Sequence, residues 1–284
     1  MTELSDLGNA STTPAGGEPT FTVRRYGWVN RIGLLTLVVR EARRFLKVAV
    51  QTVFAPTVST LLLLAVFAIA LGADREAPFA DVTFVAFLAP GLVMMSILNN
   101  AFANTSSSLI VTKIQGNSVD FLMPPLSSFE LNIGFLSGAV SRGLLVGLVS
   151  VLVIWASGLA PVSVTNIGLV MYFALAASIM LGAAGLIGGI WAEKFDHLAA
   201  VTNFVITPLS FLSGTFYAIE RLPEPFYAVS LANPLFYLID GFRAGFIGEA
   251  EGNVIFGMAY VGLWCVALVG LTQMILRSGY KLRA

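Results

Sequence analysis

Residues 167–191 read IGLVMYFALAASIMLGAAGLIGGIW, a run of 25 residues without one charged side chain. The hydrocarbon core of a bilayer is about 30 Å thick, and a helix of about 20 apolar residues crosses it. Five further stretches meet the same criterion, so the sequence predicts an all-α polytopic membrane protein with six transmembrane helices. With ends placed to within several residues, the predicted spans are Val48–Gly72, Val82–Val111, Leu131–Gly158, Ile167–Trp191, Leu198–Phe216 and Val254–Leu276.

The composition of the whole chain favours the same class. Of its 284 residues, 57% are hydrophobic and only 11% are charged, and the mean hydropathy is +0.84. Soluble domains carry about 25% charged residues, so a soluble or disordered chain is excluded. The 16 basic residues balance the 16 acidic ones, which gives no sign of a nucleic-acid partner. One cysteine, Cys265, and one histidine cannot build a disulfide or a structural zinc site, so no metal is expected.

The chain divides into three parts. The polar residues 1–20 are rich in turn formers and predict a disordered tail rather than a signal peptide. In residues 21–47, apolar side chains recur at helical spacing opposite arginines and a lysine. This pattern favours an amphipathic helix at the membrane surface over a basic extension of the first span. Residues 48–284 are predicted to form a single transmembrane domain.

The basic residues predict the orientation. Twelve of them flank one side of the predicted spans, and three flank the other. Because cytoplasmic loops carry the excess of Lys and Arg, both termini are predicted to be cytoplasmic.

Residues 217–253, between the fifth and sixth predicted spans, form an unusual segment. Its apolar run 226–238 is too short to cross a bilayer, and Pro225 and Pro234 break it up. These features predict a short re-entrant or interfacial helical hairpin on the external side. A seventh crossing is the alternative, and it is disfavoured because it would put the two chain ends on opposite sides.

The loop of residues 112–130 is predicted to be cytoplasmic, yet it carries the apolar side chains of Val119, Phe121, Leu122 and Met123. Such a patch needs a cover in water, and a soluble partner protein would supply it. The spans offer essentially no acidic residue for proton or sodium coupling, and the sequence has no GxxxxGK[ST] phosphate loop. The energy for any transport is therefore expected to come from another subunit.

A few polar residues fall inside the predicted spans. Asn99 and Asn100 either line a substrate path or hydrogen-bond between helices, and the two interpretations have equal weight. Arg142 is deep if the third span begins near Leu131, and it reaches the cytoplasmic interface if the span begins near Gly138, which we favour. Asn203 is a further candidate for the path. Small residues at four-residue spacing predict close helix packing; they are Gly134 and Gly138, Gly143 and Gly147, and Gly185 and Gly189.

The run PLSFLSGTFY, residues 208–217, precedes three shorter motifs: LP at 222–223, NPL at 233–235 and DGFR at 240–243. In this order and spacing, the segment resembles the membrane subunit of type-2 ABC exporters, a family that includes polysaccharide, nodulation-factor and drug or lipid exporters. REARRF, residues 40–45, is similar to the family's amphipathic elbow helix. Residues 116–127, which end in PLS, are similar to its coupling loop. The Met123-Pro124 pair departs from the pattern, since a small polar residue is expected there.

The resemblance implies a permease subunit in the bacterial inner membrane, with two such subunits joined to two ATP-binding subunits. The sequence does not decide between two identical and two different permease subunits.

 The favoured pair is a homodimer. ATP and Mg would bind the partner subunit, so this chain is expected to bind no cofactor and to be no enzyme. The cargo would be a lipid, glycan or drug-like amphipathic substrate that leaves the cytoplasm or the inner leaflet. An ATP-independent membrane protein, such as a scramblase or channel, is the alternative.

Candidate residues fall in three regions, of which the first two follow from the resemblance and the third from the polar residues in the spans. Contact with the ATP-binding subunit falls on Glu41, Arg44, Gly116, Asn117, Asp120, Phe121, Leu126, Ser127, Glu193 and Lys194. The external hairpin is shaped by Ser213, Gly214, Pro223, Asn233, Pro234, Asp240 and Arg243. The expected substrate path, with membrane lipid around it, holds Asn99, Asn100, Arg142 and Asn203.

Overall fold

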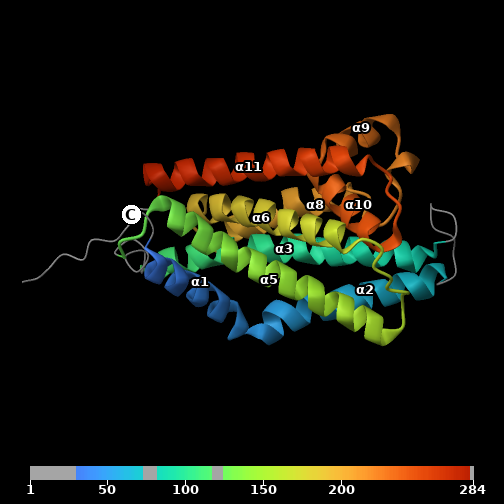
Figure 1. Ribbon diagram of the computed structural model, residues 1–284, viewed down its shortest axis with the longest axis horizontal. Helices are drawn as coiled ribbons and strands as arrows, with labels where there is room; N and C mark the ends of the chain where they lie inside the picture. Colours follow the sequence, from blue (N-terminus) through green and yellow to red (C-terminus); the bar gives the residue numbers. More distant parts are fainter. Residues whose placement is uncertain (1–29, 73–81, 117–123, 282–284) are drawn as a thin grey trace, which may run out of the picture.

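The structure, a computed structural model, describes residues 30–72, 82–116 and 124–281. Its regular elements are helices, and the long ones run side by side along an elongated bundle (Figure 1). Five helices of the described part are long and apolar enough to cross a membrane; they cover Val50–Ala70, Phe84–Ile114, Ser128–Ser157, Ile167–Trp191 and Val254–Ser278. The predicted all-helical class with several membrane spans is confirmed.

A bend joins the first of these helices to the amphipathic helix before it. α1 (Arg31–Leu46) is capped by Asn30, whose side chain accepts a hydrogen bond from the Gly33 amide at 3.0 Å. The π-helical turn η1 (Val50–Phe54) then leads into α2 (Ala55–Leu71). Pro56 has no amide hydrogen for the carbonyl four residues earlier, which favours a local change of winding. As a result, α1 and α2 point in different directions (Figure 1).

α3 (Phe84–Ile114) is the central helix of the bundle. In its most apolar stretch 83% of the residues are buried, against 11% in α11 (Val254–Ser278). It packs against α2, α5 (Ser128–Ser157), α6 (Ile167–Trp191) and α10 (Pro234–Ile247). Polar groups on α3 therefore lie inside the protein, whereas most of α11 faces outward.

The glycine pairs predicted from the sequence lie at helix contacts. Gly134 and Gly138 of α5 face Leu37 and Glu41, so this pair seats α1 on α5. Gly143 and Gly147 face Ile97 of α3, and Gly185 and Gly189 of α6 face the α3 backbone at Phe102 and Ser106. A side chain at these positions would meet a neighbouring helix, which explains the need for small residues.

The fifth predicted span, 198–216, forms a shorter helical run than expected. It consists of α7 (Phe195–Val201), the π-helical turn η2 (Thr202–Ile206) and α8 (Thr207–Phe211). The π turn comes directly before Pro208, as η1 comes before Pro56. This run is not among the five helices of the described part that are long enough to cross.

The segment 217–253 contains two short helices, as the hairpin prediction requires, but they differ in burial. After the 3₁₀ turn η3 (Ile219–Arg221), α9 (Glu224–Ala232) is mostly exposed. α10 is instead buried from Leu235 to Phe246 and packs on α3, α6 and α11. α11 then runs back along the bundle, so Ser278 and the start of α1 lie at the same end (Figure 1).

Candidate functional site

α1 is fixed to α3 by a polar cluster. The Glu41 side chain is fully buried, and it pairs with Arg44 at 3.2 Å and accepts a hydrogen bond from the Ser108 hydroxyl at 2.8 Å. The Arg44 guanidinium also donates to the Asn104 backbone and side-chain oxygens and to Ser107. Glu41 thus acts inside the chain and has no exposed surface to offer a partner. Arg44 keeps 30% of its side chain exposed.

The end of the bundle that holds the start of α1 contains the other residues assigned to a partner contact. Ser127 and Glu130 form a capping box at the start of α5, and the Asn30 amide donates to Glu130. Leu126 is half-buried beside Gly33, while Gly116 and Ser127 are exposed. Asn117, Asp120 and Phe121 lie outside the described residues, and so does most of the predicted coupling loop.

The α6–α7 connection lies at this same end. Lys281 reaches from the chain end to Glu193, with 3.1 Å between ammonium and carboxylate. The hydrogen bond and charge of Lys281 lower the pKa of Glu193. Lys194 is exposed, and the His197 ring lies against Trp191. Glu193 and Lys194 are therefore available to a soluble partner.

Arg243 of α10 is held in a closed polar site at the opposite end of the bundle. It is 0% exposed, pairs with Glu251 at 3.1 Å, and donates to the backbone oxygens of Phe87 and Gly214. Its guanidinium carbon lies 3.7 Å from the centre of the Phe87 ring. Asp240, one turn away, accepts hydrogen bonds from the amides of Glu251 and Gly252. Every charge in this site has a partner.

A second polar site ties the start of α10 to α8. Asn233 caps α10 and donates to the Leu209 carbonyl and to the Ser213 hydroxyl, both at 2.8 Å. Gly214 has a φ of +70°, a left-handed conformation that glycine adopts at no steric cost. Pro223 is exposed before α9, and Pro234 begins α10. Asn233 thus ties the start of α10 to the end of α8.

Three of the four residues predicted for a substrate path lie close together. The Arg142 guanidinium of α5 donates twice to the Asn100 side-chain oxygen, at 2.8 and 3.2 Å. Asn99 and Asn100 line a groove of about 320 Å³ between α2 and α3. The Asn100 amide thus makes a contact between helices, and a substrate path along this groove stays a prediction. Asn203, on η2, is exposed and belongs to a different part of the surface.

Arg142 lies near the middle of α5, and Asn100 lies near the middle of α3. α5 begins at Ser128, ahead of both span starts considered above, and the depth of Arg142 in the membrane stays a prediction. The neighbouring Gly143 packs on Ser178, which is itself near the middle of α6.

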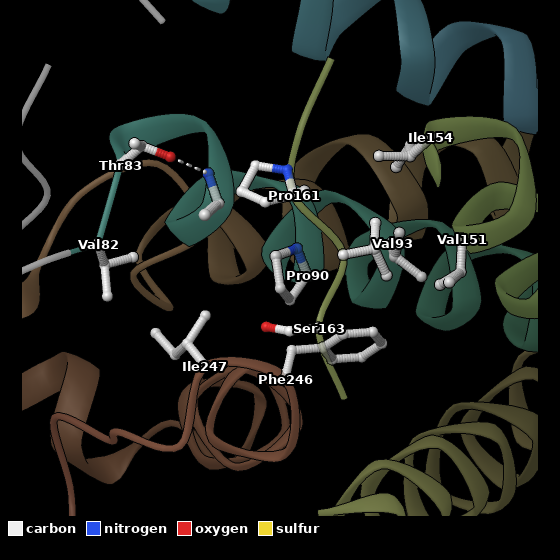
Figure 2. Close-up of a pocket in the computed structure, with 13 residues that line it drawn as sticks. Val82, Thr83, Pro90, Val93, Val151, Ile154, Pro161, Ser163, Phe246 and Ile247 are labelled. Atoms are coloured by element: carbon white, nitrogen blue, oxygen red, sulfur yellow. Dashed lines mark hydrogen bonds between the residues drawn. The ribbon is translucent and has the colours of Figure 1, made fainter. Parts of the chain in front are cut away.

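A mostly apolar cavity of about 280 Å³ lies at the far end of α3 (Figure 2). Pro90 of α3, Val151 and Ile154 of α5, and Phe246 of α10 contribute to its wall, and the connection between α5 and α6 covers it. Ser163 is one of its few polar groups. Sequence reasoning missed this cavity because its walls come from four distant segments.

Sequence reasoning also missed two polar groups. Glu251 was not singled out, although it is the ion-pair partner of Arg243. Ser96 was passed over, although its buried hydroxyl has no hydrogen-bond partner among the described residues. The spacing of Ser96 and Asn100, one helical turn apart, is the only signal that pointed to Ser96.

The long apolar helices and the polar groups between them define a multi-pass membrane protein. Residues 33–247 match the ABC-2 type transporter family. The chain belongs to this family, and it is a membrane transport permease of an ABC transporter, a class that works with an ABC ATP-binding partner.

Curated relatives agree with this membership. The chain is 31% identical to the inner membrane transport permease YadH of Escherichia coli K12, over 89% of this chain and 98% of that protein. It is 26% identical to the polysialic acid transport protein KpsM of Escherichia coli, over 78% of this chain and 85% of that protein. It is 25% identical to nodulation protein J of Rhizobium leguminosarum bv. viciae, over 66% of this chain and 71% of that protein. The resemblance stated from the sequence is confirmed.

Proposed function

We propose that this chain is the permease subunit of an ATP-driven exporter in the bacterial inner membrane, and that two copies of it join two separate ATP-binding subunits. The observation that carries the proposal is the family match over residues 33–247 in a sequence without a GxxxxGK[ST] phosphate loop. ATP would bind the partner, and this chain would supply the path through the membrane. The name of the relative YadH supports the inner membrane as the location.

The proposed topology has six spans with both termini in the cytoplasm. The helical run 195–211 serves as the fifth span, α9 and α10 form the external hairpin, and α1 is the elbow helix. Two observations support this arrangement: the described chain ends lie at one end of the bundle (Figure 1), and basic residues concentrate there.

The proposed contact with the ATP-binding subunit uses the exposed groups at that end. These are Gly116, Ser127, Glu193 and Lys194. The half-buried Leu126 would join them, as would Asn117, Asp120 and Phe121 of the coupling loop, which lie outside the described residues. Because Glu41 and Arg44 fix α1 to α3, a push on α1 would move α3 with it. ATP would in this way bias a two-state change in the spans.

The proposed cargo is a lipid, a glycan or a drug-like amphiphile. The name of the relative KpsM refers to polysialic acid transport, which supports a glycan among the possible cargoes. The near absence of acidic residues in the spans supports ATP rather than an ion gradient as the energy source.

The test is to isolate the tagged chain from native membranes in mild detergent and to identify the proteins that copurify. We expect one ABC ATP-binding protein in stoichiometric amount. The Lys194→Glu variant reverses an exposed charge at the proposed contact, so recovery of the partner should fall. Arg221→Glu makes the same change of charge at the opposite end of the bundle and should leave recovery unchanged. If no ATP-binding protein copurifies in several detergents, the scramblase or channel alternative is favoured.

A further inference from the structure

Arg142 is a cation without a counter-charge among the described residues. The ion pairs of that part of the chain are Arg44–Glu41, Arg243–Glu251 and Lys281–Glu193, and Arg142 belongs to none of them. Its hydrogen bonds go to one neutral amide oxygen, that of Asn100. The nearby charge of Arg44 has the same sign and repels it. An unpaired guanidinium midway along a membrane span is costly, so it is expected to serve a function.

Arg142 bonds to Asn100, which lines the groove between α2 and α3. Five of the residues that line this groove are polar, namely Ser59, Thr60, Ser96, Asn99 and Asn100. The Ser96 side chain is buried, lines the groove and has no hydrogen-bond partner among the described residues. A buried hydroxyl left unpaired is destabilising, and a bound ligand with a polar oxygen would supply the missing partner.

The two ends of the groove differ in polarity. α2 and α3 run in opposite directions, so Pro56 lies near Asn100 while Leu63 lies toward Leu92. The amides and Arg142 are thus gathered at one end, and the other end is apolar. A molecule that fits has a polar head and an apolar chain, and Arg142 adds a preference for negative charge in the head.

We propose that this groove binds the anionic headgroup of a membrane-borne amphiphile, with Arg142 as its counter-ion and the apolar chain of the amphiphile along Leu63 and Leu92. The inference rests on the proposed transport function, and it narrows the cargo to amphiphiles that carry a phosphate or carboxylate. Nη1 of Arg142 donates to none of the described residues and is free for an anion oxygen. Asn99 and Ser96 would bond polar oxygens beside it.

The test measures lipid binding to the purified permease in nanodiscs of phosphatidylcholine, by native mass spectrometry. Phosphatidic acid is compared with diacylglycerol, which has the same chains and no phosphate, and with inorganic phosphate, which has no chains. We expect the protein to retain phosphatidic acid about tenfold more strongly than diacylglycerol, a difference of about 1.4 kcal/mol. Inorganic phosphate alone should bind more weakly than phosphatidic acid.

Two variants examine the role of Arg142 in different ways. Arg142→Gln removes the cation. Asn100→Asp keeps the shape of the amide and places a carboxylate where the guanidinium already donates, so Arg142 gains an internal counter-ion. Both should lose the preference for phosphatidic acid, whereas Arg43→Gln, which removes an exposed arginine of α1, should retain it. If Arg142→Gln does not fold, the lipid preference of Asn100→Asp tests the role of Arg142 on its own.

A preference that survives in both variants, or that the wild type lacks, overturns the inference. If inorganic phosphate binds as strongly as phosphatidic acid, the apolar end of the groove at Leu63 and Leu92 does not bind the chain of the amphiphile, and that part of the inference is wrong. Because binding is measured on the permease alone, the two proposals can fail separately. If an ATP-binding protein copurifies but the permease shows no preference for phosphatidic acid, the proposed function stands and this inference fails. If the preference is found but no ATP-binding protein copurifies, this inference stands and the proposed function fails.

Discussion

Two arginines lie within the helix bundle, and their surroundings are opposite in character. Arg243 is fully buried and has Glu251, two backbone oxygens and the Phe87 ring around it. Arg142 is only half-buried and donates to a single neutral amide. The first site is closed by the protein itself. The second leaves one side of the guanidinium open.

The difference indicates what each charge is for. A buried ion pair contributes little net stability, but removal of one partner is costly because the other charge is left uncompensated. Arg243 is therefore bound into the architecture of α10, α3 and the turn at Gly214. Arg142 leaves no carboxylate behind among its described partners, so its loss should affect ligands more than folding.

The largest expected effect is the loss of Arg243. At pH 8, Arg243→Gln leaves the buried carboxylates of Glu251 and Asp240 without their cation, and we expect a loss of about 3–5 kcal/mol in the free energy of unfolding. Denaturant unfolding in detergent, followed by tryptophan fluorescence, measures this loss. Arg221→Gln, an exposed arginine in η3, should change the same quantity by less than about 0.5 kcal/mol. If both variants lose the same free energy of unfolding, the Arg243 site does not stabilise the fold as proposed.

A smaller effect is expected from the titration of Glu251, which lies in the loop between α10 and α11. Burial raises the pKa of Glu251 to about 7, although Arg243 attracts its negative charge. The native state then holds this proton up to about pH 7, whereas the unfolded chain releases it near pH 4.5. Stability from this group is full below pH 4.5 and is lost as the pH rises through 7.

The expected loss between pH 5 and pH 8 is on the order of 2–3 kcal/mol. Glu251→Gln cannot titrate, so its stability should change less over the same range. Unfolding curves of both proteins at several pH values give the comparison. Parallel profiles for the wild type and the variant would assign the pH dependence to other groups.

Much of the fold follows from sequence patterns with a simple physical cause. The run 167–191 predicted α6 with the same bounds, because charge-free helices of that length have no other stable environment. The glycine pairs predicted close helix contacts, though not which helices they join. The fifth span was overestimated, because hydropathy does not register the π turn before Pro208 or the left-handed turn at Gly214.

The candidate sites were predictable only in part. Asn100 and Arg142 stood out because amides and charges are rare in spans, and the structure brings them together. Asn233, Asp240 and Arg243 were named through the family resemblance. Glu251 gave no signal, since an acidic residue in a loop is ordinary until α10 folds back beside it. Glu41 was expected to contact the ATP-binding subunit, but its side chain is buried against α3. The helical spacing of α1 does not show which neighbouring helix a side chain packs on.

The smallest expected effect on folding belongs to Arg142. Arg142→Gln removes two hydrogen bonds to Asn100 but uncovers no described carboxylate, and Gln can still donate to the same amide oxygen. We therefore expect the free energy of unfolding to change by less than about 1 kcal/mol, since one neutral hydrogen bond replaces a charged one. The same denaturant series used for Arg243→Gln measures it. A loss as large as that of Arg243→Gln would mean that Arg142 is structural after all. A small loss combined with a lost preference for phosphatidic acid would separate the two arginines by role.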